Sequence, residues 1–156
     1  MRLTMFSDYT LRTLIYLAVR PETLVTIGDV SSAYGISNNH LMKVVHQLAL
    51  AGDVVTVRGQ HGGLRLGRPP AEINVGTVVR RTEADFDLVP CFGSETGCAI
   101  QPDCVLAVAL DAALRAFLAV LDRYTLADLV APRAALGRLL SMPAADQWIQ
   151  TAPLPT

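Results

Sequence analysis

Two helix-forming segments joined by a glycine turn constrain this chain more than any other feature. The first covers residues 26–35, where Thr26 followed three residues later by Asp29 is typical of a capped helix start, and Gly35 of a helix end. The second covers residues 37–52, and its apolar side chains recur at helical spacing: Leu41, Val44, Val45 and Leu48. Two helices joined this tightly predict a helix-turn-helix.

A short β-hairpin is expected directly after those helices. Residues 54–57 (VVTV) and 64–66 (LRL) are the candidate strands, and the Gly-rich basic segment RGQHGG lies between them. A helix-turn-helix followed by such a hairpin is a winged helix. Further helices are expected at residues 4–19, 74–83 and 104–123. The predicted fold class is therefore mostly α with a small β-hairpin wing, a winged helix-turn-helix plus a long dimerisation helix.

The dimerisation prediction comes from the helix at residues 104–123, which is apolar nearly all round. Its three charges, Asp111, Arg115 and Asp122, fall close to one line. One stripe of large side chains comprises Leu106, Leu110, Leu114, Phe117 and Leu121, with a surface of alanines beside it. A helix with so narrow a polar strip needs cover on two sides. We expect its own winged helix on one side and a second copy on the other; the alternative is a core helix of a monomer.

Charge and side-chain type favour double-stranded DNA as a partner. Residues 1–70 carry seven Lys and Arg against four Asp and Glu, a net charge of +3, whereas residues 71–156 carry six against ten, a net charge of −4. Helix N-termini attract phosphate, polar side chains pair with base edges, and a Gly- and Arg-rich tip suits backbone or minor-groove contact. The predicted DNA-binding residues are Ser37, Asn38, Asn39, His40, Lys43, Gln47, Arg58, Gln60, His61 and Gly62, with Arg65 and Arg68 behind the tip. The alternative for each is an ordinary solvated residue.

All three cysteines lie in one Gly- and Pro-rich stretch, at Cys91, Cys98 and Cys104, with the spacing C-x₆-C-x₅-C. A disulfide with one leftover thiol fits a reducing compartment poorly, and a loop of this composition fits inert core cysteines poorly. Zinc is usually bound by closer C-x₂₋₄-C pairs. Longer loops suit an iron–sulfur cluster held by thiolates. The spacing alone leaves zinc and a cluster open.

Catalysis and membrane insertion are not expected. The three histidines lie in the predicted DNA-binding half, and no acid–base constellation accompanies the cysteines, so we predict that the chain is not an enzyme. The start, MRLTMFSDYT, has no apolar segment typical of a secretory signal. The apolar run after residue 104 is interrupted by charges, so no membrane span is predicted. We therefore expect a cytoplasmic protein.

Four stretches together resemble the nitric-oxide-sensing members of the Rrf2-type winged-helix regulators. They are LTMFSDYTLRTLIYLA, VSSAYGISNNHLMKVVHQLALAGDVVTVRGQHGGLRLG, the three cysteines and AFLAVLDRYTLADLV, and they run from residue 3 to about residue 130. The resemblance implies a homodimeric repressor of palindromic operator DNA. It also implies an iron–sulfur cluster, preferably 4Fe–4S with 2Fe–2S as the alternative, whose damage by nitric oxide lowers DNA affinity.

The same resemblance implies the cluster ligands. The three thiolates would come from one subunit, and Asp8, at the start of the first helix, would come from the other. Arg12, one turn after Asp8, could pair with that carboxylate whenever it is free. The alternatives are a related regulator that responds to cluster supply, iron or redox state, a DNA-binding protein with structural zinc, and a metal-free thiol sensor.

These inferences divide the chain into four parts. Residues 1–83 are the expected winged helix-turn-helix DNA-binding domain, and residues 84–104 the cluster-binding loop. Residues 105–130 form the dimerisation helix region, and residues 131–156 the C-terminal tail, expected to be loose from residue 143 onward.

Overall fold

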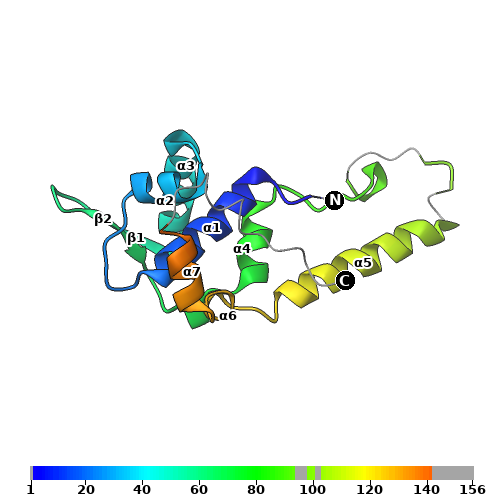
Figure 1. The fold of residues 1–156 in the computed structure, drawn as a ribbon. Coiled ribbons are helices and arrows are strands. Elements are labelled where there is room, and N and C mark those ends of the chain that lie inside the picture. The colour runs from blue at the N-terminus through cyan, green and yellow to red at the C-terminus, as the bar shows by residue number, and fades with distance from the viewer. Residues whose placement is uncertain (1, 94–97, 101–102, 142–156) are drawn as a thin grey trace.

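The structure, a computed structural model, describes residues 2–93, 98–100 and 103–141. A head of packed helices carries a β-hairpin at one end, and one long helix extends from the other end (Figure 1). The elements in chain order are α1 (Met5–Val19), α2 (Ile27–Tyr34), α3 (Asn38–Leu50), β1 (Val54–Val57), β2 (Gly63–Leu66), η1 (Pro70–Glu72), α4 (Val75–Thr82), η2 (Pro90–Phe92), α5 (Val105–Leu121), α6 (Leu126–Leu129) and α7 (Arg133–Leu139).

The helix-turn-helix forms as its local signals predict. Thr26 caps α2, and the reciprocal bonds between Thr26 and Asp29 complete a capping box. Gly35 ends α2 with φ of 66°, a left-handed conformation that glycine adopts without steric cost. Ser37 then caps α3 by accepting a hydrogen bond from the backbone N–H of His40. The turn between the two helices is therefore specified by residues next to it in the sequence.

The hydrophobic core of the head is built around α1, which packs against α3, α4, α6, α7 and β2. Leu14 and Leu17 of α1 are almost fully buried and belong to one cluster with the inward side chains of α3: Leu41, Val44, Val45 and Leu48. Thr10 and Thr13 are buried on the same helix, and their hydroxyls are satisfied there because they donate to the carbonyls of Phe6 and Tyr9, each at 2.7 Å. The predicted inward residues of α3 are confirmed.

Strands β1 and β2 pair antiparallel, with Val54 opposite Leu66 and Val57 opposite Gly63. The inner edge of β2 is extended by Val25, whose backbone exchanges two hydrogen bonds with Leu64, at 3.0 and 2.7 Å. The predicted hairpin is confirmed, and it is attached to the residue that precedes the helix-turn-helix. Together with the seven helices of the described residues, it confirms the predicted fold class, mostly α with a small wing.

Helix α5 differs from the expectation of cover by its own winged helix. No residue of α5 is buried, and of the head's helices it packs chiefly against α4. The stripe side chains Leu110, Leu114 and Phe117 are half-buried, whereas Leu106 at the outer end is 63% exposed. The alternative of a monomer core helix is wrong, because α5 extends from the head as an arm (Figure 1).

After α5 the chain returns to the head. The backbone N–H of Val75 donates to the carbonyl of Tyr124 at 2.9 Å, and that of Leu126 donates to Ile73 at 2.8 Å. Side chains from α6 and the segments beside α7 then complete the core: Leu126, Val130 and Leu140. The head thus contains residues from both sides of the arm. The domain borders stay predictions, and the tail expected to be loose from residue 143 lies outside the described residues.

Candidate DNA-reading surface, cysteine loop and arm

The first turns of α3 present a polar surface on the side opposite the core. The predicted DNA-binding residues of this helix are all exposed: Ser37, Asn38, Asn39, His40, Lys43 and Gln47. The Nδ1 atom of His40 lies 3.0 Å from Oγ of Ser37, and the imidazole ring lies 5.8 Å from the ring of Tyr9 on α1. These contacts orient His40, and its neighbours are free to meet a duplex.

A shallow hollow of about 480 Å³ lies beside this surface, between α1, α3 and α4. Its lining includes Lys43, His46 and Gln47 from α3, and also Arg81 from α4, whose guanidinium pairs with Asp53. The three side chains of α3 give this side of the head a chemistry suited to phosphate oxygens.

The hairpin tip presents a second group of predicted DNA-binding residues. Arg58, Gln60 and His61 are exposed, and Gly62 is half-buried. Gly59 has φ of 119°, and a side chain at Gly62 would overlap the carbonyl oxygen of Val57, so both positions require glycine. Arg65 is also exposed, so the tip and its flank are basic and accessible.

Arg68, predicted to lie behind the tip, is tied to the base of the wing, and its contact with DNA stays a prediction. Its guanidinium donates to the carbonyl of Ala51 at 2.7 Å and lies 3.2 Å from a carboxylate oxygen of Asp53. The Asp53 side chain is only 4% exposed, and Arg81 pairs with its other oxygen. Arg68 is therefore held at the base of the wing, because a buried carboxylate needs cationic partners.

The start of α1 carries the predicted fourth ligand. Nε of Arg12 lies 2.9 Å from a carboxylate oxygen of Asp8, and both side chains are nearly half exposed. The pairing expected for a free Asp8 is therefore present. The Arg12 guanidinium also lies 5.6 Å from the centre of the Tyr34 ring, at the end of α2. Burial raises the pKa of Tyr34 to about 12, despite the opposing effect of Arg12.

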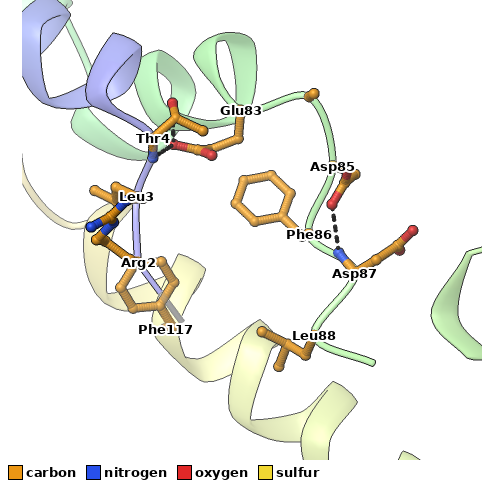
Figure 2. Close-up of a pocket in the computed structure, with 10 residues that line it drawn as sticks. Arg2, Leu3, Thr4, Glu83, Asp85, Phe86, Asp87, Leu88 and Phe117 are labelled. Carbon is orange, nitrogen blue, oxygen red and sulfur yellow. Dashed lines mark hydrogen bonds between the residues drawn. The ribbon is translucent and has the colours of Figure 1, made fainter. Parts of the chain in front are cut away.

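The segment that leads from α4 towards the cysteines runs past the start of α1. Glu83 accepts hydrogen bonds from the backbone N–H of Thr4 at 2.8 Å and from its hydroxyl at 3.1 Å. An open pocket of about 320 Å³ lies beside this contact, with Phe86 and Phe117 among its lining side chains (Figure 2). The N-terminus of α1 is thereby fixed to the end of α4.

The three cysteines are free thiols in the segment between α4 and α5. Cys91 lies in η2 and is half-buried, Cys98 is exposed, and Cys104 is the N-cap of α5, where Sγ accepts from the N–H of Ala107 at 3.4 Å. Among the described residues, no three Cys, His, Asp or Glu side chains lie close enough to hold one metal ion. The structure therefore does not bring Asp8 and the thiols together within one protomer.

The chemistry of these donors nevertheless fits an iron–sulfur cluster. All three cysteines are free thiols and none is fully buried, and thiolates are the ligands that such clusters take. The ligand assignment remains a prediction.

The side of α5 turned away from the head is apolar along its whole length. Val105, Val108 and Val120 are 79%, 66% and 42% exposed. Five exposed alanines continue the same surface: Ala109, Ala112, Ala113, Ala116 and Ala119. We call these eight residues the arm face. Exposed apolar surface of this extent is typical of an interface.

Sequence reasoning missed the ion pairs that join distant elements. Asp122, at the end of α5, pairs with Arg80 of α4, and Asp53 pairs with Arg81. The partners are 42 and 28 residues apart in the chain, so no local pattern identifies them. Separately, no helix in the described part of the chain is long and apolar enough to cross a membrane.

Comparison with known proteins shows which family the chain resembles. The Rrf2 family, described as an iron-dependent transcriptional regulator, matches residues 3–132. The HTH-type transcriptional regulator NsrR of Bacillus subtilis (strain 168) is 50% identical over 144 residues, which cover 91% of this chain and 99% of that protein. NsrR of Geobacillus kaustophilus (strain HTA426) is 47% identical over 142 residues, covering 90% and 97%. The solved structure of T. potens IscR has a TM-score of 0.68 and 24% identity, covers 98% of this chain and 93% of that chain, and shows the same fold.

Proposed function

The chain belongs to the Rrf2 family of transcriptional regulators, and on that premise we propose that it is a homodimeric repressor that senses nitric oxide through an iron–sulfur cluster. Its relatives are helix-turn-helix regulators that bind DNA and are not enzymes, and this chain is a DNA-binding regulator of the same kind. The observation that carries the proposal is the placement of the chain's only thiols in the segment that leads into an apolar arm, with Cys104 at the N-cap of that arm, while the DNA-reading surface lies on the head.

The arm face supports the homodimer. It is apolar, exposed and continuous over the 17 residues of α5, and a second copy of the same face is an occupant of matching chemistry. Two-fold pairing of this helix would place two heads on opposite sides of the pair. A palindromic operator requires two recognition helices separated by about one turn of DNA, roughly 34 Å, or a multiple of it.

On the DNA, the first turns of α3 would enter the major groove. Asn38, Asn39 and His40 would reach base edges, and Lys43 and Gln47 lie further along the same side of the helix. Ser37 and the first N–H groups of α3 would meet phosphate. The hairpin tip, with Arg58, Gln60, His61 and Gly62, would contact the neighbouring backbone or minor groove.

The cluster would be held by Cys91, Cys98 and Cys104 of one protomer and by Asp8 of the other, preferably as a 4Fe–4S cluster. A carboxylate is a weaker partner for cluster iron than a thiolate is, so when bound the group would supply one iron open to a diatomic ligand. Asp8 would then connect the start of α1 to the other protomer's arm. When that connection is lost, Arg12 captures the carboxylate, as in the pair seen here.

The proposed switch follows from where α1 lies. Tyr9, next to Asp8, contacts His40 at the start of α3, and Arg12 contacts Tyr34 at the end of α2. A change in how Asp8 is held therefore acts on the two helices of the helix-turn-helix. A coupling of about 1–3 kcal/mol would change operator affinity by roughly 5–150-fold.

The test begins with protein purified without oxygen, whose visible absorption is followed while nitric oxide is added. The proposal expects a brown protein that bleaches or shifts with a few equivalents and then binds operator more weakly. A colourless protein, with stoichiometric zinc or with no metal, refutes the cluster. If the protein is brown and its operator affinity does not change with nitric oxide but changes with iron or cluster supply, the chain is a regulator with another signal.

Asp8→Ala tests the connection between protomers, with Glu22→Ala as the matched control, since Glu22 is an exposed carboxylate in the turn after α1 and lies outside the cysteine loop. The expected result is an altered nitric oxide response in the Asp8 variant alone. A wild-type response and wild-type operator binding by Asp8→Ala would show that this carboxylate is no ligand.

A further inference from the structure

The last turn of α4 and the residue after it bind three different parts of the molecule. Arg80 pairs with Asp122 at the end of α5, and Arg81 pairs with Asp53 between α3 and β1. The hydroxyl of Thr82 lies 2.7 Å from that of Ser7 on α1. Four consecutive residues, with Glu83 holding Thr4, thus connect the arm, the recognition helix with its wing, and the first helix. Neither the DNA-reading surface nor the cysteine loop uses these contacts.

The contact between Arg80 and Asp122 is bidentate, with two guanidinium nitrogens on the two carboxylate oxygens and Nη2 to Oδ2 at 2.7 Å. The hydrogen bonds lower the pKa of Asp122 and raise that of Arg80. Both side chains are about two-fifths exposed, and exposed ion pairs add little to folding stability. Two parallel bonds do, however, fix the relative orientation of the two groups. The pair is therefore better suited to orient α4 against α5 than to stabilise the fold.

Gly76, on the first turn of α4, is shaped to this pair. Its φ is not positive, so its backbone conformation does not call for glycine. A Cβ atom there would overlap Oδ1 of Asp122 and approach Nη1 of Arg80 to 2.9 Å. Glycine lowers helix stability relative to alanine by about 1 kcal/mol in a helix interior. The space that the ion pair occupies is the physical reason for glycine at this position.

The second arginine reaches the DNA-reading elements through a buried carboxylate. The Asp53 carboxylate accepts a hydrogen bond from Arg81 and forms an ion pair with Arg68, and its backbone N–H donates to the carbonyl of Leu48 of α3 at 3.0 Å. Its carbonyl accepts from Gly67, just after β2, at 2.8 Å. Asp53 therefore joins the end of the recognition helix to the base of the wing, and Arg81 joins both to α4.

We propose that Arg80 and Arg81 are positioning residues that fix the orientation of the DNA-reading head on the arm and so set the half-site spacing that the dimer accepts. Neighbouring residues on a helix point about 100° apart, so one short helix serves both partners at once. A tilt of α5 relative to the head is passed through Asp122 and Arg80 to α4, and through Arg81 to Asp53. This inference rests on the proposed homodimer on palindromic DNA.

The test measures binding to DNA sites selected from random sequences by the wild-type protein, and to the same sites with one base pair added or removed at the centre. Two variants break the contact differently: Arg80→Gln removes the cation, and Gly76→Ala leaves both charges but fills their space. Arg115→Gln is the control, because Arg115 forms an exposed ion pair with Asp111, one turn away on the same helix. Sedimentation and thermal unfolding are measured for all variants.

For Arg80→Gln and Gly76→Ala, the preference for the selected spacing should fall about fivefold or more, the lower limit of an ordinary coupling between sites. Their affinity for an isolated half-site, their dimerisation and their thermal midpoint should match those of Arg115→Gln. The charge-exchanged pair Arg80→Asp with Asp122→Arg should restore part of the preference.

Two results overturn the inference while the proposed function stands. One is an unchanged spacing preference in both variants, and the other is a loss of half-site affinity equal to the loss on the full site, which would indicate a damaged head. A wild-type protein that is monomeric, or that selects no paired half-sites, refutes the proposed homodimeric function instead.

Discussion

Substitution of Val108 in the arm face tests the dimer most directly. The change to aspartate places a charge in the first, outer turn of a surface that is apolar over the length of α5. Leu50→Asp is the matched control, because Leu50 is also a large, exposed apolar residue, 69% accessible, but lies at the end of α3. Neither side chain contributes to the buried core, so both variants should keep the wild-type helix content.

The magnitude follows from the exposure of Val108, which is 66%. Full burial of a valine is worth at least about 1.5 kcal/mol, so covering the exposed two-thirds contributes about 1 kcal/mol per protomer. Two-fold symmetry doubles each loss. Desolvation of the new carboxylate adds at least about 1 kcal/mol per copy. The dimer with two aspartates should therefore lose about 4 kcal/mol or more, roughly a thousandfold in its dissociation constant.

Sedimentation from the low micromolar range upward measures this change. Val108→Asp should sediment as a monomer where the wild type and Leu50→Asp are dimers. Val108→Ala, which removes two carbon atoms, should lose about 2 kcal/mol per dimer, or roughly thirtyfold. A Val108→Asp protein with the wild-type dissociation constant would show that the arm face is not the interface, and the reasoning from exposed apolar surface would fail.

Three further predictions concern the head. Leu14→Ala should lower the free energy of unfolding by about 2–5 kcal/mol, measured by urea denaturation, because Leu14 is fully buried in the core. Thr26→Ala should cost about 1 kcal/mol in the same assay through loss of the capping box, and a cost equal to that of Leu14→Ala would contradict this. Burial raises the Tyr34 pKa from 10 in the unfolded chain to about 12 in the folded protein. The contribution of the protonated Tyr34 to the free energy of unfolding is therefore complete below pH 10 and is lost as the pH rises to 12. Tyr34→Phe should flatten this part of the curve of stability against pH.

Features set by neighbouring residues could be predicted from the sequence. The capping residues Thr26 and Ser37 and the left-handed Gly35 locate the helix-turn-helix to within a residue or two. The apolar residues of α3 recur at helical spacing and so identify its buried side. The polar residues on the opposite side are then expected to be exposed. The fold class depends on these local signals, which agree with one another.

Features set by distant residues could not be predicted. The sequence does not indicate that Arg68 contacts Ala51 and Asp53, because these partners are more than ten residues away in the chain. Helix α5 is apolar nearly all round, so its composition does not reveal which side meets α4 and which remains exposed. The spacing of the cysteines likewise admits more than one metal, and Asp8 is separated from them by more than eighty residues of chain.

The backbone hydrogen bonds that join Ile73 and Val75 to the residues after α5 have a consequence for how such proteins diversify. The chain leaves the head after α4, runs out along the cysteine loop, and comes back along α5 to a point beside the start of α4. The cysteine loop and α5 thus form an insertion whose two ends lie side by side in the head. Its length and thiols can change in evolution with little disturbance of the head, so one reading unit can be fitted with different sensors. For the same reason a fragment cut after residue 83 should fold poorly, because it lacks Leu126 and the other core residues supplied on the return.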